Sequence, residues 1–292
     1  MSAHAAMSSI APVITRFAPS PTGLLHLGHA HSALDGWRRA RSAAGRFLLR
    51  LEDIDPARCR SDHAAAILED LAWLGLDWDG PVRVQSQHLP EYRASLDALA
   101  ARGLLYPCFC TRAAIAQEVA RAAQAPHDPD GTPLYPGTCR SLAATERARR
   151  IAAGEPFALR LDMEAAMRVV RHPLMREEIG EGRVRCAPAR FGDVVLARKD
   201  APASYHLCVT HDDAAQGVTL VTRGCDLLPA TDLHRLLQAL MHWPEPRYAH
   251  HALLRDATGR RLAKRDAALS LRALRQAGHT PAEVRARAGF PD

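Results

Sequence analysis

The chain has 292 residues, which is long enough for a large buried core and for two domains. Its composition, 47% hydrophobic and 24% charged, is typical of a globular protein, and no apolar run approaches the roughly 20 residues that span a membrane. The seven cysteines are odd in number and scattered, which argues against a disulfide framework. These features exclude a membrane-spanning or disulfide-rich secreted protein, and we expect a cytoplasmic one.

The charge balance favours a polyanionic partner. The formal net charge is +6 and the isoelectric point is about 9.2. Only Lys199 and Lys264 are lysines among the 38 basic residues, so an arginine-favouring composition accounts for part of the charge. Each lysine is therefore a stronger indication of a specific function, because lysine supplies a compact ammonium group where arginine supplies a planar guanidinium.

The first hundred residues predict alternating strands and helices. Residues 13–17 form a short apolar run, and a Pro/Gly loop leads to a helical pattern over 29–43 and a second strand over 45–53. This succession predicts a right-handed parallel crossover, the unit of a doubly wound α/β sheet. Apolar residues three or four apart predict further helices over 59–78 and 90–103.

The remaining chain divides into three parts. Residues 106–190 are rich in Cys, Pro, Gly and Arg and break the alternation, so we interpret them as an inserted subdomain. Apolar runs over 203–213 and 217–228 predict strands of the same sheet, followed by a helix over 229–243. The last 40 residues predict a polar loop and two short helices. The division is therefore a split catalytic domain (1–105 and 191–250), an insertion (106–190) and a C-terminal region (251–292).

The turn after the first strand is a candidate phosphate site. Pro19 and Pro21 stiffen it, Gly28 permits close approach to the backbone, and His26 and His29 fall on one helical face. Helix N-termini at the carboxyl ends of parallel strands bind anions, and the common Gly-rich phosphate loops are absent from the sequence. The alternative is a helix-start turn with two surface histidines.

A second basic motif, TGRRLAKRDAAL, begins at Thr258. A solvated basic face is the ordinary explanation of such a cluster. Lys264 argues for a function, because its ammonium could follow a phosphate through a reaction.

Three thiols in the insertion indicate a metal site. Cys108, Cys110 and Cys139 lie in a proline-rich segment with little core of its own, where tetrahedral Zn²⁺ could replace hydrophobic burial. Ordinary zinc chemistry allows His127 as a fourth ligand. Buried, metal-free thiols are the alternative.

The run RFAPSPTGLLHLGHAHSAL, together with FLLRLEDID, resembles the glutamyl branch of the class I aminoacyl-tRNA synthetases. The two signatures of that family, H-I-G-H and K-M-S-K-S, are similar to residues 26–29 and 261–265. The resemblance implies ATP-dependent activation of L-glutamate with Mg²⁺, with His26, His29 and Lys264 in catalytic roles and Pro19 and Gly28 also at the ATP. It also favours the Tyr135 oxygen over His127 as the fourth zinc ligand.

The same resemblance implies an amino-acid pocket made of five residues. Two carboxylates require cations or donors and an ammonium requires an acceptor, since unpaired buried charges are costly. Arg223 suits a carboxylate and Glu52 suits the ammonium, although a lone Arg or Glu at a strand end is more often a surface residue. The implied set is Arg16, Ser20, Glu52, Tyr205 and Arg223.

The length indicates which members of the branch the chain resembles. Only 27 residues follow Arg265, too few for an anticodon-binding domain. Short, zinc-containing members transfer glutamate to the queuosine base in the anticodon of tRNA(Asp), so we expect an RNA partner and neither DNA nor membrane. Arg-rich stretches 146–190 and 255–287 are candidate RNA contacts.

Two alternatives stay open at this point. One is a compact enzyme that charges a tRNA 3′ end, and the other is an RNA-binding paralogue without catalysis. Three residues depart from the family pattern: Arg261 and Ala263 remove an ammonium and a hydroxyl from the second signature, and Cys225 stands where related chains often carry an acidic residue.

Overall fold

The computed structural model describes residues 12–121, 127–129, 131, 133–254 and 270–291. Its first half is a three-stranded parallel sheet in the order β1 (Ile14–Phe17), β2 (Arg46–Leu51) and β3 (Arg83–Val84). α1 (Leu27–Ser42) and α2 (Ser61–Trp73) connect these strands, and the short 3₁₀ helix η1 (Gln85–His88) and α3 (Leu89–Ala101) follow β3. Gly45 allows the turn before β2 to approach β1, because a Cβ there would lie 2.0 Å from the carbonyl oxygen of Val13.

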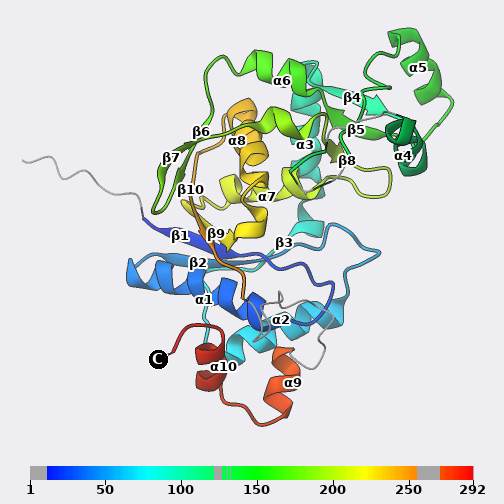
Figure 1. Ribbon diagram of the computed structural model, residues 1–292. Helices are drawn as coiled ribbons and strands as arrows, with labels where there is room; N and C mark the ends of the chain where they lie inside the picture. Colours follow the sequence, from blue (N-terminus) through cyan, green and yellow to red (C-terminus); the bar gives the residue numbers. More distant parts are fainter. Residues whose placement is uncertain (1–11, 122–126, 130, 132, 255–269, 292) are drawn as a thin grey trace, which may run out of the picture.

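A second sheet has the order β7-β6-β10-β9. The strands β9 (Leu220–Gly224), β10 (Arg247–His251) and β6 (Met175–Glu178) are parallel, and β7 (Gly182–Arg185) is an antiparallel edge. The two sheets meet where the amide of Thr219 donates to the carbonyl oxygen of Ile14 at 3.0 Å. Figure 1 shows α1 and α2 on one side of the strands and α7 (Tyr205–Ala215) and α8 (Ala230–Met241) on the other.

This arrangement confirms the expected mixed α/β class, but the expected strand over 203–213 is wrong. Those residues begin α7, whose first turn is capped by the Ser204 side chain accepting from the amide of Leu207. The helix buries residues on most of its circumference, including Leu207, Val209 and Asp212. A helix buried on most of its circumference has no clear 3.6-residue pattern, so its apolar run is easily taken for a buried strand.

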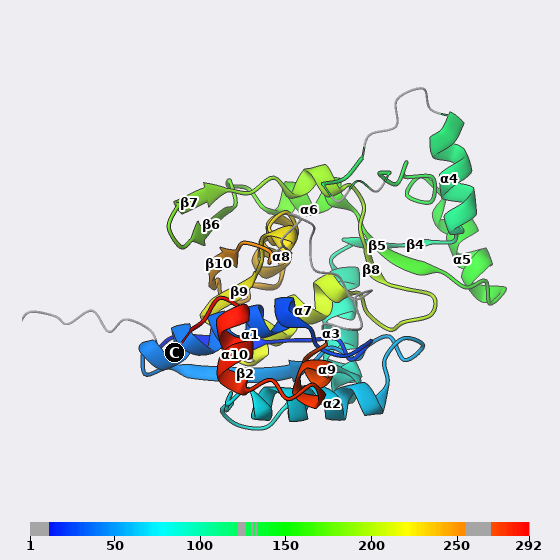
Figure 2. The ribbon, with the colours of Figure 1, turned by 60° about the horizontal axis from the view of Figure 1, so that its bottom comes forward.

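The cysteine-rich part of the chain forms a third sheet, which is antiparallel. Its strands are β4 (Leu105–Cys108), β5 (Ala158–Leu161) and β8 (Val195–Ala197), accompanied by α4 (Arg112–Arg121), α5 (Ala144–Ala152), α6 (Met163–Val169) and the 3₁₀ helix η2 (Pro188–Phe191). Figure 2 shows this part projecting beside the parallel sheets. β6 lies within the expected insertion range yet pairs with β10. The proposed division into domains remains a prediction.

The two short helices expected at the end of the chain are present. α9 (Leu271–Gln276) packs against α2, and α10 (Pro281–Arg287) packs against α1 (Figure 2). Their apolar residues Leu271, Leu274 and Val284 join one of the two main core clusters, which lies between the first sheet and its helices. Among the described helices, none has both the length and the apolar character needed to cross a membrane.

Candidate active site

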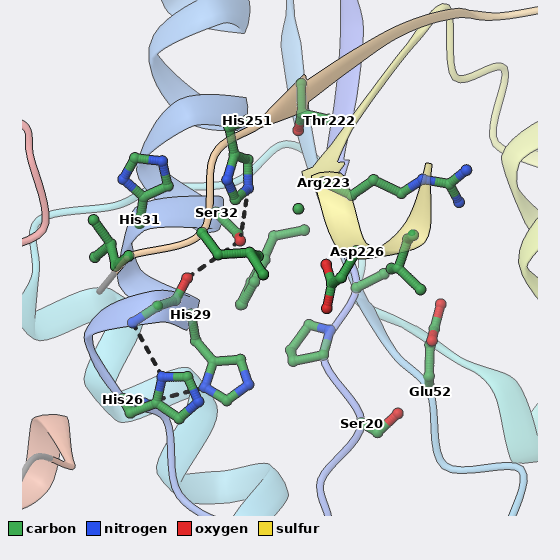
Figure 3. A pocket seen from close by; sticks show the side chains of 18 of the residues that line it. Ser20, His26, His29, His31, Ser32, Glu52, Thr222, Arg223, Asp226 and His251 are labelled. Atoms are coloured by element: carbon green, nitrogen blue, oxygen red, sulfur yellow. Dashed lines mark hydrogen bonds between the residues drawn. The ribbon is translucent and has the colours of Figure 1, made fainter. Parts of the chain in front are cut away.

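A cavity of about 570 Å³ opens where β1, β2, β9 and β10 end. Figure 3 shows its two unlike sides, with His26, His29, His31 and His251 on one and Ser20, Glu52 and Arg223 on the other. Parallel strands bring their carboxyl ends to one edge, which is where open α/β sheets bind ligands. The lining residues are Arg16, Phe17, Ala18, Pro19, Ser20, His26, Gly28, His29, His31, Ser32, Glu52, Tyr205, Thr222, Arg223, Gly224, Asp226, Leu227, His251, Leu253 and Leu254.

The first two histidines are fixed by the N-terminus of α1. His26 is the N-cap, and its Nδ1 accepts from the amide of Gly28 at 3.0 Å. Nδ1 of His29 accepts from the amide of His26 at 3.1 Å, which completes a capping box. A neutral imidazole that accepts at Nδ1 carries its hydrogen at Nε2. Both rings, with centroids 3.8 Å apart, therefore have an N–H donor at the nitrogen not used for capping.

Gly28 is required by this cap. A Cβ at residue 28 would lie 2.9 Å from Cε1 of His26, so a larger residue would push the ring out of its capping position. The close approach that the sequence predicted for a ligand is made here by the imidazole of His26. Pro19 lies across the turn and its carbonyl oxygen accepts from the amide of Glu52 at 3.0 Å, which ties the turn to the end of β2.

Glu52 places a buried carboxyl group in the cavity. Burial raises its pKa from 4.5 to about 7, an effect partly offset by Arg50 and Arg16. The nearest cation is Arg50, whose Nη1 lies 3.9 Å from Oε1 of Glu52. Arg50 itself is held by Asp213 at 2.5 Å, so its charge is shared.

Arg16 also lines the cavity, but its guanidinium is engaged within the protein. Nε and Nη2 donate to the Asp213 carboxylate at 2.9 and 3.3 Å, and Nη1 donates to the carbonyl oxygen of Thr222. Both Arg16 and Arg50 lower the pKa of Asp213, although burial opposes the shift. Asp213 of α7 thus fixes two cations of the first sheet beside the cavity.

Arg223, near the end of β9, is the third cation. Its guanidinium donates to His250, His234 and Thr231, none of them an acid. Tyr205 begins α7, and both Tyr205 and Ser20 line this cavity and a neighbouring one of about 310 Å³. All seven site residues predicted in residues 16–52, together with Tyr205 and Arg223, therefore line one cavity.

Lys264, the remaining predicted catalytic residue, lies outside the described residues, as do Arg261 and Ala263. Of the described residues on either side of that segment, one lines the cavity and the other pairs with a residue that lines it. Leu254 lines it, and Ser270 pairs with His26 while the amide of Leu271 donates to the carbonyl oxygen of Leu25 at 2.8 Å.

The predicted metal ligands form a separate cluster in the antiparallel part. The sulfurs of Cys108, Cys110 and Cys139 all lie within 4.8 Å of one another, with Cys110 and Cys139 3.4 Å apart. The Tyr135 hydroxyl lies 3.5 Å from the Cys110 sulfur. Zinc bonds of about 2.3 Å in a tetrahedron would place sulfurs about 3.8 Å apart, so this donor set fits zinc. His127 is exposed and outside the cluster.

Sequence reasoning missed five polar residues of the cavity, one of which is Thr222 of β9. His31 and Ser32 follow the first signature on α1, and Ser32 Oγ lies 2.9 Å from Nε2 of His251 at the end of β10. Asp226 follows the exposed Cys225 and lines the cavity, while Cys225 does not. His251 could have been found from its position in the sequence, because it ends a parallel strand just as Glu52 follows one, and ligands bind at the carboxyl ends of such strands.

Comparison with known proteins places the chain among tRNA synthetases. The family described as tRNA synthetases class I (E and Q), catalytic domain, matches residues 12–287. A protein of Rhodobacter capsulatus named Glutamyl-Q tRNA(Asp) synthetase is 49% identical over 95% of this chain and all of its own length, and a Nocardia farcinica protein of the same name is 46% identical over 92% of this chain and 81% of its own.

Longer relatives are similar as well. A Glutamate–tRNA ligase 2 of Alkalilimnicola ehrlichii is 41% identical over 93% of this chain and 57% of its own length. The crystal structure of a glutamate tRNA ligase from Elizabethkingia meningosepticum in complex with its amino acid is 29% identical with a TM-score of 0.74, covering 87% of this chain. The chain spans about half, 52%, of that structure.

Proposed function

Because the chain belongs to the family of class I tRNA synthetases for glutamate and glutamine, and is therefore a ligase, we propose that it glutamylates the queuosine base in the anticodon of tRNA(Asp). In the first step a carboxylate oxygen of L-glutamate attacks the α-phosphorus of ATP, and the bond to pyrophosphate breaks. In the second step a hydroxyl of the queuosine cyclopentenediol attacks the glutamyl carbonyl, loses its proton and releases AMP.

The single observation that carries the first step is the cavity with two chemically different sides. On one side, the Nε2–H groups of His26 and His29 can donate to phosphate oxygens, beside Pro19 and Gly28. Lys264 and Mg²⁺, which would accompany ATP, would neutralise further phosphate charge. Positioning and charge stabilisation suffice for this reaction, because the substrate carboxylate is itself the nucleophile.

On the other side, the cavity suits an amino acid with two carboxylates. Arg223 is a cation for one carboxylate, Arg16 lies near the second, and Ser20 and Tyr205 supply hydroxyls. Glu52 is the acceptor for the ammonium group. The similarity to the Elizabethkingia glutamate tRNA ligase, whose structure is in complex with its amino acid, supports an amino-acid substrate for this chain.

The acceptor assignment is supported by the names of the relatives that match this chain over most of their length. The net charge of +6 favours an RNA partner and the Arg-rich segments within 146–190 and 255–287 are the proposed contacts. We place the protein in the cytoplasm, where ATP and tRNA occur together and the seven cysteines would stay reduced.

We further propose that Cys108, Cys110, Cys139 and Tyr135 hold a structural Zn²⁺. The cluster is bounded by a small apolar group that includes Tyr106, Phe109 and Phe157. Metal binding would add to the stability of this small group, because Leu161 and Leu196 of the same sheet pack in a separate, larger core cluster.

The experiment is glutamate-dependent pyrophosphate exchange without RNA, followed by transfer of labelled glutamate to three RNAs: queuosine-containing tRNA(Asp), queuosine-free tRNA(Asp) and tRNA(Glu). We expect exchange, and transfer only to the first. Transfer to tRNA(Glu), as the similarity to Glutamate–tRNA ligase 2 allows, would replace the acceptor assignment with 3′-end charging. Loss of both reactions would contradict glutamate activation.

A further inference from the structure

Arg223 is a buried cation whose described hydrogen-bond partners are all uncharged. Its side chain is 5% exposed. Nε donates to Nε2 of His250 at 3.2 Å, Nη1 to Nδ1 of His234 at 3.1 Å and Nη2 to Oγ1 of Thr231 at 2.5 Å. Within the part of the chain that the structure describes, no carboxylate lies within 4.0 Å of this guanidinium. The comparably buried Arg16, Arg50 and Arg176 each have a carboxylate closer than 3 Å.

The arginine sets the tautomer of both histidines. A guanidinium only donates, so Nδ1 of His234 must accept and its hydrogen lies on Nε2, which donates to Nδ1 of His206 at 3.2 Å. Nε2 of His250 likewise accepts, and its Nδ1–H donates to Glu178 at 2.9 Å. Burial and the neighbouring charge of Arg223 lower the pKa of His250 to about 4 and the pKa of His234 well below its usual value.

The described elements around Arg223 provide no direct counter-ion for its positive charge. α8 contributes Thr231 and His234, α7 contributes His206 and Tyr205, and β10 contributes His250 and Tyr248. β6 contributes Glu178, which contacts Arg223 only through the imidazole of His250. The remaining charged neighbours are cations: Arg176 of β6, beside Glu178, and Arg16 of β1. A buried cation without a counter-ion is costly, and an anionic ligand in the cavity offsets that cost.

We propose that His234 and His250 are positioning residues for Arg223: as neutral imidazoles in fixed tautomers they hold its guanidinium while leaving its charge available to a substrate carboxylate. The proposal rests on the proposed function in that it takes the substrate to be L-glutamate. A carboxylate at either position would also hold the arginine, but it would neutralise the charge and so compete with the ligand.

Replacing His234 with an acid of similar size therefore distinguishes the positioning role from a role in packing alone. His234→Asn keeps an acceptor near the position of Nδ1, whereas His234→Asp keeps an acceptor of almost the same size and adds a negative charge. We expect His234→Asp to raise the glutamate KM in pyrophosphate exchange at least about 30-fold, and His234→Asn no more than about 5-fold. The kcat and the KM for ATP should stay within about threefold in both. His63→Asn on α2, which does not line the cavity, is the matched control.

His250 provides a second pair if His234→Asp does not fold. His250→Gln keeps an acceptor for Arg223, and His250→Leu removes it, so the leucine variant should show the larger rise in glutamate KM. Equal effects of Asp and Asn at 234, or of Gln and Leu at 250, in folded protein overturn the positioning role. A wild-type protein that shows neither exchange nor a glutamate-induced rise in Tm overturns the proposed function instead, and this proposal with it.

Discussion

At the scale of single residues, the protonation of Glu52 decides whether the cavity can accept an ammonium group. Its pKa of about 7 means that the empty cavity holds a substantial fraction of neutral Glu52 at neutral pH. Only the charged form pairs with the ammonium of glutamate. Because the folded-state pKa is raised, lowering the pH below 7 adds a proton that binding must remove.

We therefore expect the glutamate KM to rise about tenfold for each pH unit below 7 and to level off above it. Pyrophosphate exchange between pH 5.5 and 8.5 measures this. Glu52→Gln should raise the KM at all pH values and abolish the slope. A KM of the wild-type enzyme that is flat across this range would contradict the ammonium role of Glu52.

His26 combines a structural and a proposed chemical function in one ring. Nδ1 caps α1, and the Nε2–H is the proposed phosphate donor. Asparagine is a good N-cap but has no donor at the position of Nε2, so His26→Asn should keep the capping function and lose the proposed phosphate contact. We expect it to keep the free energy of unfolding within about 0.5 kcal/mol while exchange kcat falls at least about tenfold.

His26→Ala removes both functions and is the comparison variant. It should also lose about 1 kcal/mol of stability, measured by urea unfolding. Wild-type kcat in His26→Asn would show that the ring serves only as a cap.

The sequence predicted these individual residues better than their partners. His26 and His29 could be placed on one turn because they are three residues apart, and Glu52 follows a strand that is easily recognised. The pairs Arg16–Asp213 and Arg223–His250 join different elements, in the first case 197 positions apart. Such pairings depend on strand order and register, which local patterns do not determine.

At the scale of elements, the thiol cluster connects the chain after β4 with the segment before α5. We expect the purified protein to contain about one zinc per chain, because three neighbouring thiols and a phenol supply the four ligands of a structural zinc site. Cys110→Ser should lose the metal and make the segment between β4 and β5 the first site of limited proteolysis.

Zinc content by atomic absorption and a protease digestion time course test this expectation. Cys225→Ser, at an exposed cysteine outside the cluster, is the matched control and should keep the metal. Metal-free wild-type protein with the same protease resistance would show that the thiols are only packed.

The contact between α2 and α9 contains a buried acid. Asp70 is fully buried. Among the described residues, neither of its carboxyl oxygens has a hydrogen-bond partner, and its closest cation is Arg275 at 3.9 Å. Burial raises its pKa from 3.8 to about 6, although Arg275 and Arg272 oppose the shift. The folded protein therefore binds this proton more tightly than the unfolded chain, so Asp70 costs stability as the pH rises from about 4 through 6.

We expect Asp70→Asn to raise the free energy of unfolding at pH 8 by about 1–2 kcal/mol and to change it little at pH 4.5. Urea unfolding at the two pH values measures the difference. Glu69→Gln, which removes the exposed partner of Arg275, should cost less than about 1 kcal/mol at both. A variant less stable than wild type at pH 8 would show that the Asp70 charge is favourable.

The elements themselves were partly predictable. Helices with one polar face, such as α2 and α3, and strands between turn residues, such as β1 and β2, follow from the pattern. α7 does not, because burial on most of its circumference removes the periodicity and only its cap residue Ser204 indicates a helix start. The pairing of β6 with β10 was missed because a short polar strand, MREE, carries almost no signal.

At the scale of the whole molecule, the cavity is made by segments from both ends of the chain. The turn after β1 supplies the histidines, β9 and β10 supply Arg223 and His251, and Ser270 pairs with His26. Folding brings these segments together because β9 lies beside β1, with the amide of Thr219 bonded to Ile14. The site therefore forms only when the two parallel sheets have joined.

The chain has two lysines, and they provide a matched pair for testing the last proposed catalytic group. In the sequence, Lys264 lies between Leu254, which lines the cavity, and Ser270, which pairs with the lining residue His26. Lys199 instead donates to the carbonyl oxygen of Phe109 beside the thiol cluster. We expect Lys264→Ala to lower exchange kcat at least about tenfold, because a donor to transition-state charge is lost, and Lys264→Arg to recover only part of it. Lys199→Ala should leave exchange unchanged. If both alanine variants retain wild-type kcat, the charge on the triphosphate is neutralised without lysine, and the histidines and Mg²⁺ must suffice.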